Sequence, residues 1–138
     1  MEIIAEIGSS WNGSFELLDL LVANCKRLKI AACKLQAFDH HFSDAHDNYP
    51  CLKDAAVTIE NVDKINNIFL KYSMKWYATP TYTAAVDFID PYVSRWKIRF
   101  KDRNNKLLIE KCKSTGKELI ISTSTPVDAD VNLYVIPK

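Results

Sequence analysis

Five polar side chains stand out because each interrupts a short apolar run and each could take part in anion or acid–base chemistry. They are Glu6, Lys34, Gln36, Lys97 and Ser122. Two lysine ammonium groups in one apolar interior repel each other and tend to lose their protons unless an anion or a carboxylate shares the space. Glu6 could neutralise one of them, and a phosphate or carboxylate ligand is a natural partner for both. These residue types therefore predict a site for a small, multiply charged anion.

The same residues allow a second interpretation. Glu6 and Lys34 could form an ion pair that only stabilises a filled interior and binds no ligand. Polar residues that recur in four separate apolar runs, rather than in one, favour the anion site. Both interpretations remain open on the residue pattern alone.

Apolar runs alternate with segments of helical periodicity along the chain. The runs that predict strands occupy 3–8, 30–38, 75–79, 95–100 and 118–123. Apolar residues at helical spacing follow the first four of these runs, from Ser14 to Leu28, from Thr58 to Tyr72, over 83–90 and over 107–114. The polar segment 39–57 is unusually long for a loop in a compact domain, which suggests a functional role. This alternation predicts an α/β fold with a parallel sheet.

Alternation within each strand predicts which side chains share a face. The apolar set suits the face that meets the helices: Cys33, Leu35, Trp96, Ile98, Leu119 and Ile121. The other set is predicted to place five polar residues inward: Glu6, Lys34, Gln36, Lys97 and Ser122, with Arg95 and Arg99 sharing the parity of Lys97. These five lie toward the carboxyl ends of the strands, where barrel enzymes carry their active sites.

The last β-prone segment, 131–136, departs from this alternation. Only 124–130 separate it from the strand over 118–123, and this link contains Pro126 and no helical periodicity. A parallel crossover normally needs a dozen or more residues. The segment is therefore expected to be antiparallel, to cross over irregularly, or to be a truncated end, and its orientation stays open.

Composition excludes several classes of protein. A chain of 138 residues, 48% hydrophobic and 25% charged, fits one soluble domain over 1–138. Its net charge of +1, with acids and bases interspersed, argues against nucleic-acid and membrane partners. No apolar run approaches the ~20 residues that span a bilayer, and the first six residues do not resemble a secretion signal, so a cytoplasmic location is expected. The four scattered cysteines form no C-x-x-C pair and are expected to be reduced and structural.

Five short motifs resemble the sialic acid synthase family. Residues 4–13, IAEIGSSWNG, are similar to its I-A-E-I-G-x-N-H-x-G opening, and residues 34–38, KLQAF, to K-x-Q-T-F on its second strand. Residues 78–80, ATP, resemble the S-T-P that closes its third strand. Residues 97–98 match the K-I of K-I-x-S-G-E, and residues 122–123 the S-T of S-T-G-M. Five matches in the same order indicate a common fold and ancestry.

The resemblance implies the first part of a TIM-type (β/α) barrel, with about five parallel strands, four helices and the sixth segment. Family members condense phosphoenolpyruvate with N-acetylmannosamine or a related N-acylated sugar in an aldol-type reaction that uses a divalent metal, Mn or Mg, and releases phosphate. Carried over by position, the substrate-binding residues would be Lys34, Gln36, Thr79, Lys97 and Ser122. Lys34, Lys97 and Ser122 would hold the phosphate and carboxylate, while Glu6 would act beside the reacting carbons as the catalytic residue.

The chain departs from the family pattern at several positions. Ser10 and Trp11 replace the usual Asn-His, which removes polar groups near the sugar. Residues 100–102, FKD, replace the Ser-Gly-Glu after strand four, and Ser124 replaces the glycine after strand five. The family's metal-binding histidines lie on later strands than this chain contains, so no metal ligand is assigned. The histidines that are present, His40, His41 and His46, lack ligand spacing and are expected in a solvated loop.

On these grounds the chain alone is not expected to be fully active, and its status as an enzyme stays open. The alternatives are a non-catalytic remnant, a module that binds phosphoenolpyruvate or another anion, and one half of a split enzyme. A homodimer or a complementing chain would cover the unpaired strand edges of an open barrel. A Schiff-base lysine at Lys97, which borohydride trapping would reveal, is a further enzymatic alternative. The sequence does not disclose which sugar is recognised.

Overall fold

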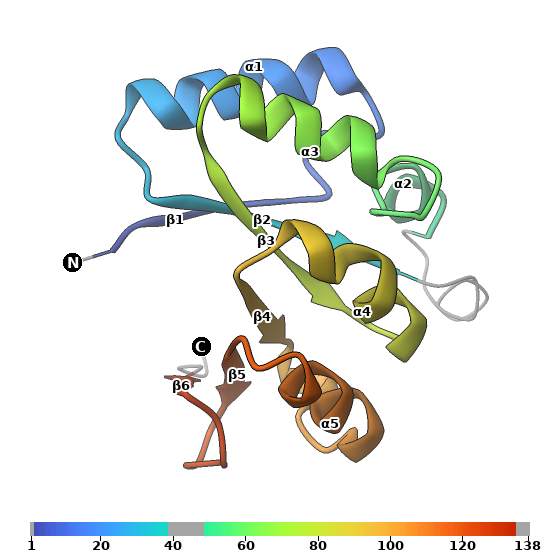
Figure 1. The fold of residues 1–138 in the computed structure, drawn as a ribbon, viewed down its shortest axis with the longest axis vertical. Coiled ribbons are helices and arrows are strands. Elements are labelled where there is room, and N and C mark those ends of the chain that lie inside the picture. The colour runs from blue at the N-terminus through green and yellow to red at the C-terminus, as the bar shows by residue number, and fades with distance from the viewer. Residues whose placement is uncertain (1, 39–48, 135–138) are drawn as a thin grey trace.

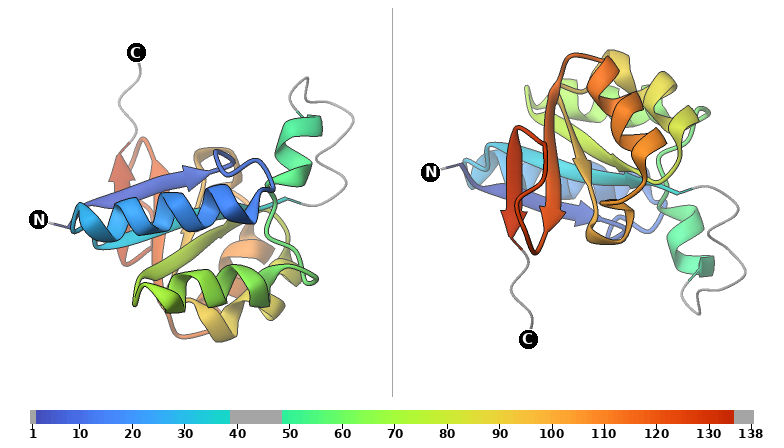
Figure 2. Two further views of the ribbon diagram at one scale, coloured as in Figure 1. Left: turned by 90° about the horizontal axis from the view of Figure 1, so that it is seen from above. Right: turned by 90° about the horizontal axis from the view of Figure 1, so that it is seen from below.

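The computed structural model describes residues 2–38 and 49–134. Within these residues, six strands form one curled parallel sheet in the order β1-β2-β3-β4-β5-β6. Helices cover the convex face of this sheet, which leaves the concave face for a site (Figures 1 and 2). The predicted α/β architecture, an incomplete TIM-type barrel, is confirmed.

The strands are β1 (Ile4–Gly8), β2 (Ala32–Ala37), β3 (Lys75–Pro80), β4 (Arg95–Ile98), β5 (Glu118–Thr123) and β6 (Val131–Tyr134). The helices are α1 (Phe15–Arg27), α2 (Tyr49–Asp54), α3 (Val62–Lys71), α4 (Thr83–Ile89) and α5 (Lys106–Ser114). Short 3-10 helices at Asp90–Tyr92 and Phe100–Asp102 flank β4.

The helices begin where side chains satisfy free backbone amides. The Leu17 amide donates to the Ser14 hydroxyl at the start of α1, and the Leu108 amide donates to the side-chain oxygen Oδ1 of Asn105 at the start of α5. The helix expected from Thr58 begins four residues later. There the Thr58 amide instead donates to the Asn61 side chain, which holds 58–61 as a turn.

The core lies between the convex face of the sheet and the helices. Cys33, Leu35, Trp96, Ile98, Leu119 and Ile121 are all buried there, as the alternation predicts. Apolar helix residues such as Leu18, Val22, Ile65 and Phe69 pack in the same cluster. Because one face of each strand is committed to this core, the opposite face of each strand must point into the concave side.

The segment 39–57 is not wholly a loop, because it contains α2. This helix has only six residues, too few to show an apolar repeat in the sequence. The residues that follow it, Ala55, Ala56 and Val57, are buried, and the Val57 amide donates to the carbonyl oxygen of Gln36 on β2. The end of this segment is thus fixed against the sheet, whereas residues 39–48, with the three histidines, lie outside the described residues.

The sixth strand is parallel to β5, with Ser122 opposite Leu133 in the ladder. Of the possibilities left open by the sequence, the irregular crossover is the one observed. Two side chains replace the missing crossover helix. Asn132 both accepts from the Val127 amide and donates to the Val127 carbonyl, and Asp130 accepts from the Leu119 amide. These bonds satisfy backbone groups of the link and of the strand start, so seven residues suffice.

In the described part of the chain, no helix is long and apolar enough to cross a membrane.

Candidate functional site

A cavity of about 390 Å³ lies on the concave face of the sheet. Its walls come from all six strands of the described sheet, and they include Glu6, Lys34, Tyr77, Lys97 and Ile120. Three of the five inward residues predicted from alternation, Glu6, Lys34 and Lys97, therefore meet in one hollow. The remaining wall toward the open side is apolar, with Val131 and Leu133 from β6.

Lys34 is the most deeply placed charge in this cavity, with only 3% of its surface exposed. Its ammonium group lies 2.8 Å from a carboxylate oxygen of Glu6 and donates over 3.1 Å to the Thr79 hydroxyl. Burial lowers the pKa of Lys34, and the attraction of Glu6 opposes this effect. The carboxylate of Glu6 is itself more than half exposed, so it remains accessible from the cavity.

Lys97 lies across the same cavity on β4. Burial lowers its pKa from the ordinary value of 10.5, and Glu6 again opposes the shift. The charge of Lys97 also lowers the pKa of Lys34. One carboxylate thus faces two partly desolvated lysines, so these three groups carry a net charge of +1 that suits an anion, while Glu2, Arg95 and Glu118 bring the formal charge of the whole lining to zero.

The other predicted residues form the next layer toward the carboxyl ends of the strands. Gln36, Thr79 and Ser122 each follow a cavity-lining position by two residues, so they share its face but lie beyond its walls. Thr79 and Ser122 are buried, at 1% and 4% exposure. Gly8 makes room for this layer, because a Cβ at that position would lie 2.9 Å from the Glu6 carboxylate and 3.6 Å from the Gln36 side chain.

Sequence reasoning gave no role to Tyr77, which pairs with Lys34 across β2 and β3. Its phenol is buried in the cavity wall, and burial raises the pKa of Tyr77 to about 12. The sequence contains a signal for this position, because Tyr77 lies two residues before Thr79 and therefore points to the same face of the strand. Arg95 was predicted to face inward but was given no function, and it also lines the cavity.

The comparisons with known proteins decide the family. The family model described as the NeuB family matches residues 21–135, which include β2 to β6. The chain belongs to the NeuB family. An uncharacterized protein of Methanocaldococcus jannaschii is 28% identical over 124 residues, which cover 88% of this chain and 37% of that protein.

Solved structures share the NeuB-family fold. The crystal structure of an N-acetylneuraminic acid (sialic acid) synthetase from Leptospira borgpetersenii, in complex with citrate, has a TM-score of 0.80 at 23% identity, over 94% of this chain and 46% of that one. A spore coat polysaccharide biosynthesis protein of Bacillus subtilis has a TM-score of 0.71 at 18% identity, over 88% of this chain and 36% of that one. The family resemblance drawn from the five motifs is confirmed. This NeuB-family chain spans less than half the length of each of these relatives.

Trp11, which replaces a polar residue of the family motif, is part of the core of this NeuB-family chain. It is 1% exposed, packs on Phe15 with ring centroids 5.6 Å apart, and donates its indole N–H over 2.9 Å to the Ala55 carbonyl. Gly13 allows the backbone of this loop to approach the end of α2 closely, because a Cβ there would lie 2.6 Å from the Asp54 carbonyl oxygen. The loop after β1 is therefore attached to the segment after α2.

The divalent metal that the family resemblance implies does not fit the residues described here. In residues 2–38 and 49–134, no three His, Cys, Asp or Glu side chains come together as a ligand set. Glu6, the carboxylate best placed in the cavity, is already paired with Lys34.

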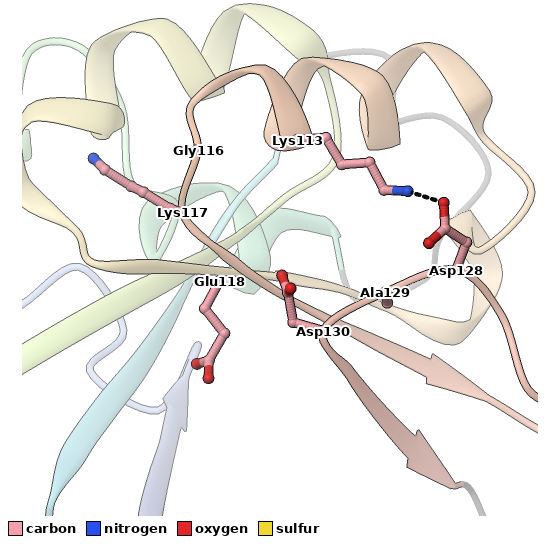
Figure 3. A pocket seen from close by; sticks show the side chains of 7 residues that line it. All are labelled: Lys113, Gly116, Lys117, Glu118, Asp128, Ala129 and Asp130. Atoms are coloured by element: carbon pink, nitrogen blue, oxygen red, sulfur yellow. Dashed lines mark hydrogen bonds and ion pairs between the residues drawn. The ribbon is translucent and has the colours of Figure 1, made fainter.

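A second hollow, of about 640 Å³, lies at the amino-terminal end of β5, between the end of α5 and the link to β6, and shares Glu118 with the first cavity (Figure 3). Lys113 reaches across it to Asp128, and Lys117 bonds instead to Asp90. Asp130 in the same wall accepts the Leu119 amide. These charged groups hold α5, β5 and the link to β6 together. The lining of this hollow contains two lysines and three acidic residues, so it has no excess of positive charge that would attract an anion.

Proposed function

We propose that this chain binds phosphoenolpyruvate between Lys34 and Lys97, as the first part of a sialic acid synthase-like barrel. The observation that carries the proposal is that both lysines and Glu6 line one cavity on the concave face. The reaction proposed for the complete barrel is the aldol-type condensation of phosphoenolpyruvate with N-acetylmannosamine or a related sugar, with release of phosphate.

Electrostatics favours such a ligand. Burying a lysine charge costs free energy, and an opposite charge in contact with the lysine offsets this cost. Here the single carboxylate of Glu6 acts on both Lys34 and Lys97. Phosphoenolpyruvate brings a phosphate and a carboxylate, so each ammonium group can receive a negative partner. The same lysines would then offset the charge that develops on the leaving phosphate.

The remaining roles follow from position. Thr79 and Ser122, with Gln36, would bind the ligand from the layer at the carboxyl ends of the strands. Glu6, exposed beside the paired Lys34, would act on the sugar or on the forming intermediate. The resemblance places the family's metal-binding histidines on strands beyond these six, so we expect residues 1–138 by themselves to bind phosphoenolpyruvate without forming the condensation product.

Phosphoenolpyruvate binding is tested by the melting temperature of the chain at rising ligand concentration. A saturable increase is expected, since a ligand that binds only the folded state stabilises it. Burial lowers the pKa of both lysines from 10.5, so they lose charge earlier than exposed lysines do as the pH rises. The increase should therefore shrink as the pH is raised from about 7.5 toward 10.5. No increase at neutral pH, with well-folded protein, would contradict the proposal.

The open sides of the sheet favour a second candidate, half of a split enzyme or a homodimer. β1 and β6 are the two edges of the described sheet, and on β6 Val131, Leu133 and Tyr134 are 39–56% exposed. Strands from another chain would cover these apolar residues and pair both edges. Size-exclusion chromatography at increasing concentration should show association, whereas a monomer throughout would leave the single-chain binding module as the better description.

A further inference from the structure

Arg95 joins three strands at the amino-terminal side of the cavity. Its guanidinium group lies 3.0 Å from a carboxylate oxygen of Glu2 and 3.0 Å from one of Glu118. It also lies over the ring of Tyr77, 5.6 Å from the centroid. Glu2 lies two residues before the start of β1, while Arg95 begins β4 and Glu118 begins β5.

The contact between Glu2 and Arg95 crosses the concave face. Two strands, β2 and β3, lie between β1 and β4 in the sheet. On a flat sheet the backbones of β1 and β4 would lie about 14 Å apart, because neighbouring strands are about 4.8 Å apart. The two side chains meet because the sheet curls and both point to its concave side. The ion pair therefore depends on the curl, and in turn it favours the curl.

This contact lies next to the proposed anion site. Arg95 precedes Lys97 by two residues on the same face of β4. Glu2 begins the segment that carries Glu6, the partner of Lys34. The contact that Arg95 makes with Glu2 therefore spans the same two sides as the anion site, β1 with β2 on one side and β4 on the other.

Arg95 differs from the two lysines because its charge is balanced by more than one carboxylate. Two carboxylates hold its guanidinium group, so no net positive charge is left there for a ligand. Its side chain is 20% exposed, which limits the approach of a further anion. The arrangement suits a residue that positions others, and Glu2 and Glu118 are the groups through which it does so.

We propose that Glu2, Arg95 and Glu118 form a clamp across the half-barrel that holds Lys97 at the right distance from Lys34 and Glu6 to share one anion. The clamp rests on the proposed function, because it positions the same site. Arg95 is thereby a positioning residue that does not itself touch the ligand.

Neutralising the carboxylates of the clamp gives a test whose sign separates positioning from direct binding. Glu2→Gln and Glu118→Gln should each weaken phosphoenolpyruvate binding by about fivefold. Each substitution removes one partly exposed ion pair of the clamp, and the free energy of such a pair corresponds to about this change in affinity. If Arg95 bound the anion directly, the same substitutions would free its charge and tighten binding. Arg95→Gln should weaken binding at least as much, and Arg95→Lys should restore part of it.

Two variants with matched charge changes serve as controls. Glu110→Gln on α5 and Arg27→Gln on α1 are exposed and outside the cavity, and they should leave the affinity within about twofold. Isothermal titration calorimetry with phosphoenolpyruvate measures each dissociation constant. Unchanged or tighter binding in Glu2→Gln and Glu118→Gln would overturn the clamp.

The clamp contact is also tested without any ligand. In a thermal-denaturation cycle of Glu2→Gln, Arg95→Gln and the double variant, the losses in melting temperature should be less than additive. Additive losses in a chain that binds phosphoenolpyruvate would overturn the clamp alone. A parent chain that fails to bind phosphoenolpyruvate would instead overturn the proposed function, whatever the cycle shows.

Discussion

Lys34→Ala and Lys97→Ala should each abolish the increase in melting temperature that phosphoenolpyruvate gives the parent chain. Each substitution removes a charge-assisted contact worth about 1.5–3 kcal/mol, which corresponds to roughly 10- to 150-fold in affinity. The larger effect is expected for Lys34, because its loss leaves the Glu6 carboxylate unpaired and facing the anion.

Two further variants make this result specific. Lys34→Met keeps most of the buried stem and should lose binding like Lys34→Ala, which separates loss of charge from loss of packing. Lys26→Ala removes an exposed charge from the end of α1 and should keep the full increase. If both cavity variants still respond to phosphoenolpyruvate like the parent, the anion site lies elsewhere.

Trp11→Ala should cause the largest loss of stability among the substitutions considered. The indole is almost fully buried, and truncating such a side chain costs about 3–5 kcal/mol in the free energy of unfolding. Trp11→Phe should cost about 1–3 kcal/mol, because it leaves the buried Ala55 carbonyl without its donor. Equilibrium unfolding in urea measures both values.

The exposed Leu20 on α1 provides the control for Trp11. Leu20→Ala should change the free energy of unfolding by less than about 0.5 kcal/mol, since its side chain is 58% exposed. A loss below about 1 kcal/mol for Trp11→Ala would show that the loop after β1 is not attached to the segment after α2 in solution. Trp11 would then be free to act near the ligand, contrary to its place in the core.

The inward face of the sheet could be predicted because it depends on local alternation. Once one set of strand residues is apolar enough to meet the helices, the other set must point inward, and this placed Glu6, Lys34 and Lys97 correctly in one cavity. The helix starts at Ser14 and before Leu108 likewise depend on side chains within three residues. Short-range rules suffice for such features.

Features that depend on distant contacts could not be predicted. The contact of Glu2 with Arg95 joins residues 93 apart and exists only because the sheet curls. The resemblance places the motif that contains Trp11 near the sugar, but the hydrogen bond from its indole N–H to the Ala55 carbonyl holds this side chain in the core. The direction of β6 was undecidable because it depends on the side chains of Asp130 and Asn132, which replace a crossover helix.

The central claim, that Lys34 and Lys97 contact one anion, is tested most directly by NMR of the lysine side-chain amino groups during a phosphoenolpyruvate titration. The signals of both residues, assigned with single Lys→Arg variants, should shift together and saturate with the same dissociation constant. A shift of only one signal, or saturation of the two at different concentrations, would contradict a shared site.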